Sequence, residues 1–213
     1  MSHVLIIGAS KGIGLEAVKR ALACGHSVRA LARSANRIRL SDPNLEKCPG
    51  NALKREDVQS ALGGIDTVIQ ALGIAAGPEM VLGPVLLFSR STRLLVPAME
   101  DAGAKRLICV TGFGAGDSRA SIGCLQSIPF RIFLGRAYDD KDVQEVLIRE
   151  SDLDWVIVRP GVLTNGRRTG RYRVLVSPNS WRNGFISRAD VADFLIRQID
   201  DDSYLGKTPV IVY

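Results

Sequence analysis

Residues 3–25 read HVLIIGASKGIGLEAVKRALACG, and this stretch decides the fold class. It begins with the apolar run HVLIIG (3–8), which is typical of a buried β-strand. From residue 12 the apolar residues recur at helical spacing as far as Gly25, a suitable residue to end a helix. Between strand and helix lies the loop Gly8-Ala-Ser-Lys-Gly12-Ile-Gly14. A glycine-rich loop in this context predicts a dinucleotide-binding βαβ unit rather than a simple structural turn.

The glycine loop has the residues that a dinucleotide requires. Gly8 permits a tight turn, Gly12 lets the backbone approach the pyrophosphate, and Gly14 allows close packing of helix on strand. The N–H groups at the start of the helix would then meet the phosphates. We therefore expect the following residues of this loop to bind the cofactor: Gly8, Ser10, Lys11, Gly12 and Ile13.

The remainder of the chain alternates short β-branched runs with longer amphipathic ones. Further strands are expected at 27–33, 45–48, 66–73, 105–112, 154–161 and 209–213, and helices at 55–62, 85–102, 140–151 and 187–199. Pro97 predicts a kink or an early end of its helix, and residues 113–135, rich in Gly and Ser, are expected to be largely loop. Residues 171–176 are a candidate extra strand over the site. This alternation predicts one Rossmann-type α/β domain over residues 1–213, with a doubly wound parallel sheet in a three-layer α/β/α arrangement.

Composition excludes several classes of protein. The chain has 213 residues, of which 46% are hydrophobic and 23% charged, as in ordinary globular proteins. No apolar run approaches the roughly 20 residues that span a bilayer, and the start lacks a basic region and a cleavage site. We therefore expect a cytoplasmic protein without a membrane partner. Two histidines and four cysteines without ligand spacing predict no metal site, and Cys24 and Cys109 are expected in the core.

The net charge of +6 raises the question of nucleic acid as a partner. The basic residues are nevertheless spread along the chain. The densest cluster consists of Arg167, Arg168, Arg171 and Arg173. A solvated surface with some anion-binding positions is favoured, so no nucleic-acid partner is expected.

The end of the second strand indicates which dinucleotide is bound. An acidic residue there accepts hydrogen bonds from a ribose 2′-hydroxyl, whereas Arg accommodates a 2′-phosphate. This chain has Ala32-Arg33-Ser34, and no acidic residue occurs between Ser27 and Asp42. Lys11 is a second cation for the same phosphate. NADP(H) is therefore favoured over NAD(H), with a plain surface role for Arg33 as the alternative.

The loop sequence GASKGIG resembles that of the short-chain dehydrogenase/reductase superfamily. Further segments are similar to an atypical, single-domain branch of it, which includes biliverdin reductase B (flavin reductase) and NmrA-like proteins. They are Gly50-Asn-Ala-Leu53, Ala71-Leu-Gly73, Val110-Thr-Gly-Phe-Gly-Ala-Gly-Asp117, Ser151-Asp-Leu-Asp-Trp155 leading to Val158-Arg-Pro-Gly161, and Ile186-Ser-Arg-Ala-Asp-Val-Ala192. The branch usually has Gly-Asp where this chain has Gly50-Asn51, a departure that still allows a hydrogen bond to adenine.

The resemblance implies further cofactor contacts along the strand ends. They are Ser34, Asn51, Ala52, Ala71, Leu72, Gly73, Thr111, Gly112, Lys141, Pro160 and Gly161. Conventional members of the superfamily also use a catalytic Ser, Tyr and Lys, with Tyr and Lys four residues apart. Here Tyr138 and Lys141 are three apart, Ala137 holds the four-residue place, and Thr111 stands where the Ser would be. Thr111, Tyr138 and Lys141 are the candidate catalytic residues. For Lys141 the alternative is an exposed helical pair with Glu145.

The displaced Tyr favours one class of acceptor. A ketone develops alkoxide charge and needs a placed proton donor, whereas a flavin or quinone can take its proton from water. We therefore expect a reductase that transfers hydride from NADPH to a small conjugated acceptor: a flavin, quinone, tetrapyrrole or carbonyl compound. Candidate walls are Met80, Phe88, Phe113 and residues 128–134, with 112–124 as a mobile lid. Arg167, Arg168 and Arg171 are candidates for attracting an anionic acceptor.

Two other functions are compatible with the sequence. A non-catalytic, NADP-binding redox sensor resembling NmrA is favoured by the altered Tyr–Lys spacing. An epimerase or dehydratase acting on nucleotide-sugars is disfavoured, because such proteins usually have a larger C-terminal substrate region. We expect a monomer or weak homodimer.

Overall fold

Eight strands form the central sheet of the computed structural model, in the order β3-β2-β1-β4-β5-β6-β10-β8. The structure describes residues 1–74, 85–121 and 124–213, and only the backbone at 120–121 and 124–134. The strands are β1 (His3–Ile7), β2 (Ser27–Ala32), β3 (Leu45–Pro49), β4 (Thr67–Gln70), β5 (Arg106–Val110), β6 (Asp154–Pro160), β8 (Arg173–Leu175) and β10 (Val210–Val212). All neighbours pair in parallel except β8, which is antiparallel to β10. This order confirms the predicted Rossmann-type α/β fold.

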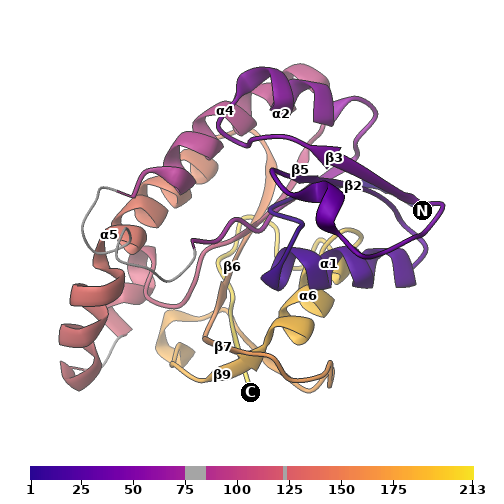
Figure 1. The fold of residues 1–213 in the computed structure, drawn as a ribbon. Helices are drawn as coiled ribbons and strands as arrows, with labels where there is room; N and C mark the ends of the chain where they lie inside the picture. Colours follow the sequence, from indigo (N-terminus) through magenta and orange to yellow (C-terminus); the bar gives the residue numbers. More distant parts are fainter. Residues whose placement is uncertain (75–84, 122–123) are drawn as a thin grey trace.

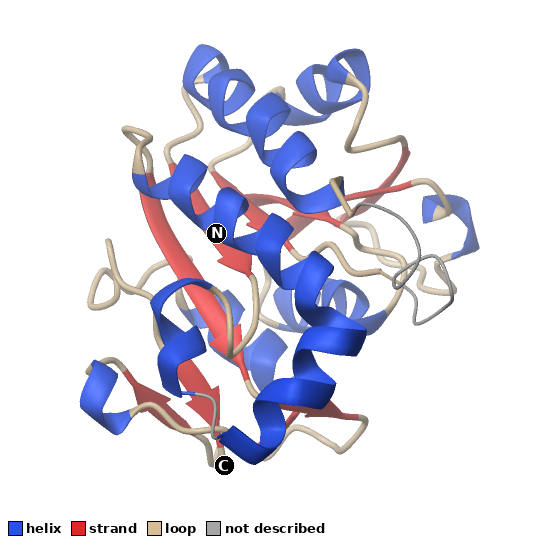
Figure 2. Ribbon diagram, turned by 90° about the vertical axis from the view of Figure 1, so that its left-hand side faces the viewer, coloured by secondary structure: helices blue, strands red, loops and turns tan. Residues whose placement is uncertain are grey.

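Helices cover both faces of the sheet. Figure 1 shows α1 (Gly12–Ala23) and α6 (Arg188–Arg197) on one side, and α2 (Arg55–Leu62), α4 (Leu87–Ala102) and α5 (Cys124–Arg149) on the other. Figure 2 views the second side, with helices in front of the strands. Short 3-10 turns lie at η1 (Ala35–Arg37), η2 (Gly116–Ser121) and η3 (Pro178–Ser180). A separate parallel pair, β7 (Val162–Thr164) and β9 (Phe185–Ser187), follows the end of β6.

The core consists of two layers, one on each face of the sheet. Along β1, Val4 and Ile6 pack with the side of α1 and α6, whereas Leu5 and Ile7 pack with the side of α2 and α4. Because both faces are covered, the central strand β1 is apolar at four consecutive residues, Val4 to Ile7, rather than alternating with polar residues. The carboxyl ends of the strands remain as the edge where a ligand can bind.

Four expectations about local structure were wrong in whole or in part. Residues 113–135 are not largely loop, because α5 begins at Cys124 and continues to Arg149. Pro97 does not end its helix: α4 continues to Ala102 and ends at Gly103 in the left-handed conformation. Packing of α4 against α5 and α2 outweighs the local penalty, about 3 kcal/mol for a proline. Residues 173–175 form a strand at the edge of the main sheet, not over the site, and Cys24 is exposed.

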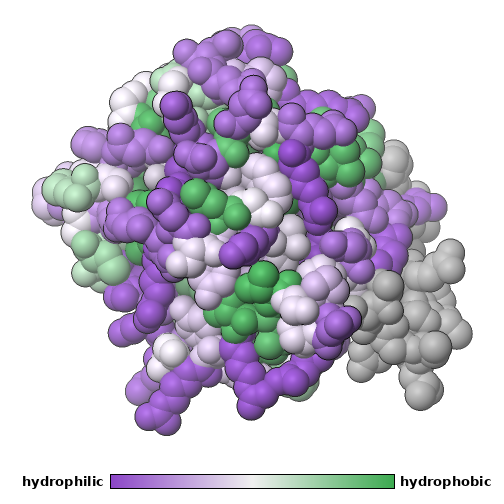
Figure 3. Space-filling view, turned by 180° about the vertical axis from the view of Figure 1, so that it is seen from behind, coloured by the Kyte–Doolittle hydropathy of each residue, from purple (hydrophilic) through white to green (hydrophobic). Residues whose placement is uncertain are grey.

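The surface carries no sign of a membrane span in the described part of the chain. No helix there is long and apolar enough to cross a bilayer. The face seen from behind in Figure 3 is largely hydrophilic, with hydrophobic side chains in small separate groups.

Candidate functional site

The candidate site lies at the carboxyl edge of the sheet. β1, β4, β5 and β6 are consecutive neighbours in the sheet and run in parallel. Gly8, Ala71, Thr111 and Gly161 each follow one of these strands directly. The predicted cofactor residues after these four strands are therefore brought to one edge.

The glycine loop has the shape of a phosphate cradle. A side chain at Gly14 would collide with the carbonyl oxygen of Gly8, so the start of α1 sits tightly against the loop. Gly12 has φ +61° and open space where a side chain would stand. Lys11 occupies the N-cap position, but its side chain caps none of the N–H groups of the first turn, and that turn has no acidic residue. An uncapped, electropositive helix start that is open at Gly12 fits a pyrophosphate.

Two basic residues flank the cradle. Ser34 Oγ donates a 2.9 Å hydrogen bond to Ser10 Oγ, which joins the loop after β2 to the glycine loop. Arg33 and Lys11 each adjoin one of these serines, and both side chains are exposed. Neither has an ion-pair partner within the described residues.

The loop after β3 borders a shallow pocket of about 310 Å³. The Asn51 N–H donates to Asp57 Oδ2 at 2.7 Å, and Asn51 Oδ1 accepts from the Leu53 N–H at 3.1 Å. Leu53 lines the pocket together with Arg90, Arg93 and Leu94 of α4. Sequence reasoning did not single out Arg90 and Arg93, although their spacing of three puts them on one face of a helix. Ala52 and Ala71 are buried, Leu72 is half-buried and Gly73 is exposed.

Lys141 lies between two aromatic rings at the end of β5. Its Nζ donates a 2.5 Å hydrogen bond to the carbonyl oxygen of Thr111. The same atom is 5.0 Å from the ring centre of Phe88 and 4.8 Å from that of Tyr138. Burial lowers the pKa of Lys141 to about 8, against an opposing effect of Cys109 and Glu145.

The hydroxyl of Tyr138 lies against the Cα of Gly112. A Cβ at Gly112 would be only 2.6 Å from this hydroxyl oxygen. Burial raises the pKa of Tyr138 to about 12. Lys141 Nζ faces the ring of Tyr138 and donates its hydrogen bond to the Thr111 carbonyl, so its position does not offset the effect of burial on the pKa of Tyr138.

A buried charge network lies behind these residues. Glu145 is 2% exposed and Arg159 is fully buried. Glu145 Oε1 accepts from the Thr111 hydroxyl at 2.8 Å and from Arg159 Nε at 3.0 Å, and its Oε2 accepts from Arg159 Nη2 at 2.5 Å. Glu145 is therefore not an exposed helical partner of Lys141, the alternative drawn from the sequence. An arginine inside the apolar run DWVIVRPG was the signal for this network, because a buried charge needs a partner.

The same network fixes the loop after β5. Arg159 Nη2 also pairs with Asp117 Oδ1 at 2.6 Å. Gly116 N–H donates to Asp142 Oδ1 at 2.6 Å, and Gly114 N–H donates to Ser118 Oγ at 2.9 Å. A lid movement of 112–118 would have to break these bonds.

Several expected wall and cofactor residues have defined places. Phe88 and Phe113 are buried, while the side chains of Met80 and residues 128–134 lie outside the described part. The Pro160 carbonyl accepts from the Phe113 N–H at 2.9 Å, so the end of β6 is joined to the loop after β5. Among the expected anion-binding arginines, Arg168 pairs with the buried Asp193 at 3.3 Å, and Arg167 and Arg171 are exposed.

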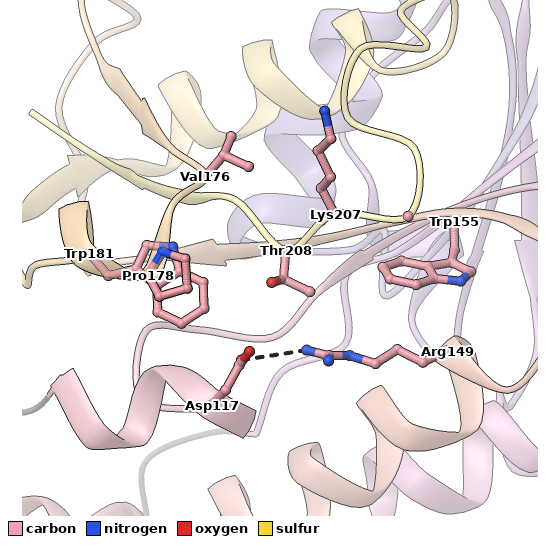
Figure 4. A pocket seen from close by; sticks show the side chains of 9 residues that line it. Asp117, Arg149, Trp155, Val176, Pro178, Trp181, Lys207 and Thr208 are labelled. Carbon is pink, nitrogen blue, oxygen red and sulfur yellow. Dashed lines mark hydrogen bonds and ion pairs between the residues drawn. The ribbon is translucent and has the colours of Figure 1, made fainter.

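A second pocket, of about 210 Å³, borders the buried charge network, because Asp117 in its lining pairs with Arg159. Figure 4 shows Asp117 and Arg149 paired below Thr208, with Trp155 at one end and Trp181 with Pro178 at the other. Trp155 is the second residue of β6, whereas Trp181 lies over the guanidinium of Arg159, close to the carboxyl end of the same strand. Across the described ranges, no group of three or more His, Cys, Asp or Glu side chains is arranged to hold a metal ion.

Comparison with known proteins agrees with this geometry. The NAD(P)H-binding family model matches residues 8–202. The chain is 26% identical to the uncharacterized protein YwnB of Bacillus subtilis, covering 97% of this chain and 96% of that one. It is 25% identical to the photosystem II assembly factor Ycf39 of Synechocystis, of which it spans 62%. A solved structure described as ChuY, an anaerobilin reductase of Escherichia coli O157:H7, superposes with a TM-score of 0.81 at 25% identity, covering 99% of this chain and 97% of that one.

Proposed function

Because the chain belongs to the NAD(P)H-binding family, we propose that it is an NADPH-dependent reductase acting on a small conjugated, tetrapyrrole-like acceptor. The observation that carries this proposal is the uncapped start of α1, open at Gly12, on the same sheet edge as Lys141. A bound nicotinamide would supply the hydride. The protein residues would hold the phosphates, orient the ring and exclude water.

The preference for NADPH rests on Arg33 and Lys11. The Ser10–Ser34 hydrogen bond keeps their backbones close, and both side chains are exposed without a carboxylate partner in the described part of the chain. Two such cations can bind a 2′-phosphate, Arg33 as a bidentate fork and Lys11 as a point charge. Arg90 and Arg93, beside Leu53, are proposed to border the adenosine half.

The tetrapyrrole-like acceptor is supported by similarity to the anaerobilin reductase at 25% identity. It is also supported by the position of Tyr138, whose hydroxyl lies against Gly112 and whose ring faces the ammonium of Lys141. Such a site suits an acceptor with a delocalised π-system better than a simple ketone. We expect the protein to act in the cytoplasm as a monomer or weak homodimer.

The test is a titration of the purified protein with NADPH and NADH, followed by NADPH oxidation with biliverdin, flavin mononucleotide, menadione and a simple ketone. Tight NADPH binding with turnover of biliverdin supports the proposal. If the protein reduces only the flavin or the quinone, the acceptor is of that class and not a tetrapyrrole. Binding without turnover of any acceptor would favour a redox sensor, and no dinucleotide binding would refute the proposal.

A further inference from the structure

We propose that Lys141 Nζ, and not the hydroxyl of Tyr138 or Thr111, donates the proton that completes reduction of the acceptor. This inference rests on the proposed reductase function. It depends on three neighbouring groups that differ in what each can donate: a threonine hydroxyl, a tyrosine hydroxyl and a lysine ammonium.

The Thr111 hydroxyl already has an acceptor for its only proton. It donates to Glu145 Oε1 at 2.8 Å. Both oxygens of Glu145 are also bonded to Arg159, in the forked geometry that an arginine forms with a carboxylate. Because a carboxylate in this pairing only accepts, Thr111 must be the donor in its bond to Glu145. Thr111 is only 4% exposed, so its proton cannot be turned toward a ligand without breaking a buried network.

The Tyr138 hydroxyl is a poor donor for a different reason. A tyrosine acts as a proton donor near neutral pH when a cation lowers its pKa. Lys141 lies over the ring face of Tyr138 at 4.8 Å, and burial raises the pKa of this tyrosine to about 12. The shift is therefore opposite to the one that proton donation requires.

Lys141 has protons that it can donate, and it lies at the carboxyl end of β5, where the acceptor is expected to bind. An ammonium has three N–H donors, and among the described residues only the Thr111 carbonyl accepts one of them. Its side chain is half-buried, on α5 next to the carboxyl end of β5. The groups facing it from outside its helix are the Cys109 thiol of β5, the Thr111 carbonyl just after β5, and the Phe88 ring of α4. Its own helix contributes Tyr138 and Glu145. Burial brings the pKa of Lys141 to about 8, near the pH at which a general acid must work.

A bound reduced nicotinamide would supply a hydride, and with it two electrons, to a carbon of the acceptor. The π-electron pair of the acceptor shifts to a nitrogen or oxygen, which forms a bond to the proton of Lys141 Nζ as the N–H bond breaks. Lys141 is left as a neutral amine and recovers a proton from water.

The first experiment measures Lys141 without any turnover. Lysine labelled with ¹³C at Cε is followed by NMR across pH 6 to 11, and Lys141→Arg identifies the resonance. We expect a titration midpoint near 8. Lys105→Arg, at an exposed lysine before β5, is the matched control and should leave that resonance in place. A midpoint near the value of about 10.4 for a free lysine would overturn the proposal.

The second experiment compares variants in NADPH oxidation with biliverdin. Lys141→Arg keeps the charge and the donors but does not release a proton, so NADPH affinity should stay within about fivefold while kcat falls about 100-fold or more. The decline of the wild-type rate as pH rises through about 8 should also vanish. Tyr138→Phe should lower kcat by less than about tenfold. If Tyr138→Phe is the variant that loses turnover and Lys141→Arg is not, the proton donor is Tyr138.

The two proposals fail in different ways. If the wild-type protein reduces biliverdin and Lys141→Arg is equally active, the reductase function stands and the proton-donor role is refuted. If the wild-type protein binds no dinucleotide, or binds it and reduces no acceptor, both are refuted.

Discussion

The Ser34 hydroxyl donates a hydrogen bond of 2.9 Å to the Ser10 hydroxyl, across a separation of 24 residues. This bond joins the end of β2 to the glycine loop and brings together the two exposed cations next in sequence, Arg33 and Lys11. A dinucleotide held at the start of α1 would present its ribose 2′-position to the end of β2.

We predict that Arg33→Ala weakens NADPH binding about 10- to 100-fold, because a charge-assisted hydrogen bond contributes about 1.5–3 kcal/mol. NADH binding should change less than about threefold, since NADH has no 2′-phosphate. Isothermal titration with both dinucleotides measures the difference. Arg39→Ala, an exposed arginine further along the same connection, serves as the control. Equal losses for NADPH and NADH would remove the argument for a 2′-phosphate site.

Gly12→Ala tests the phosphate cradle. Gly12 has φ +61° with open space around it, so the added methyl costs about 1 kcal/mol in backbone strain but collides with nothing. The methyl would occupy the space of the pyrophosphate, and we expect dinucleotide affinity to fall at least about tenfold. Gly25→Ala is a close match, because Gly25 also has a positive φ, +81°, and open space, but lies beyond the other end of α1. Gly25→Ala should lose about as much stability as Gly12→Ala but should keep the wild-type affinity for the dinucleotide. A normal affinity in Gly12→Ala would argue against phosphate binding at this loop.

The glycine loop and the β1–α1 unit could be predicted because their residues interact over short distances. The strand, the turn and the helix of residues 3–25 all depend on local spacing. The long α5 could not be predicted in this way, because it crosses a Gly- and Pro-containing stretch whose helical state depends on packing against α4.

The candidate site, like α5, depends on contacts between residues that are distant in sequence. Thr111, Tyr138 and Lys141 were identified from their positions, and the structure brings all three together. The hydrogen-bond direction of the Thr111 hydroxyl depends on Glu145 and Arg159, which are 14 residues apart in sequence and meet only when α5 packs on β6. A sequence can indicate that a buried arginine needs a carboxylate, but not which carboxylate it meets.

Removing Arg159 should reveal how strongly this network depends on its pairing. Arg159→Met leaves the carboxylate of Glu145 buried without its main partner, and we expect a loss of about 3–5 kcal/mol in the free energy of unfolding. The double variant Arg159→Met with Glu145→Leu should recover part of this loss. It leaves the Thr111 hydroxyl without its Glu145 acceptor, at about 1–3 kcal/mol, and it also removes the Arg159 partner of the exposed Asp117 side chain. Urea unfolding measures both variants. If the double variant is less stable than Arg159→Met, the stability loss in Arg159→Met does not come from leaving the Glu145 carboxylate unpaired.

Asp190 makes stability depend on pH at the other end of the domain. It is fully buried at the start of α6 and accepts hydrogen bonds from the Thr169 and Gly170 N–H groups at 2.8 and 2.7 Å, and from the Tyr213 hydroxyl at 2.7 Å. Burial alone would raise its pKa, but these hydrogen bonds outweigh burial and lower the pKa below its usual value of 3.8. The folded form therefore binds its proton less readily than the unfolded chain.

The stability contributed by Asp190 is therefore present above the unfolded pKa, about 3.9, and is lost as the pH falls through the lower folded value. We predict that Asp190→Asn is less stable than wild type at pH 7 by about 1–3 kcal/mol. The difference between the two proteins should shrink between about pH 5 and pH 3. Asp200→Asn, at an exposed aspartate just after α6, should follow the wild-type curve. Urea unfolding at several pH values measures the slope, and a constant difference between Asp190→Asn and wild type over that range would contradict a lowered pKa.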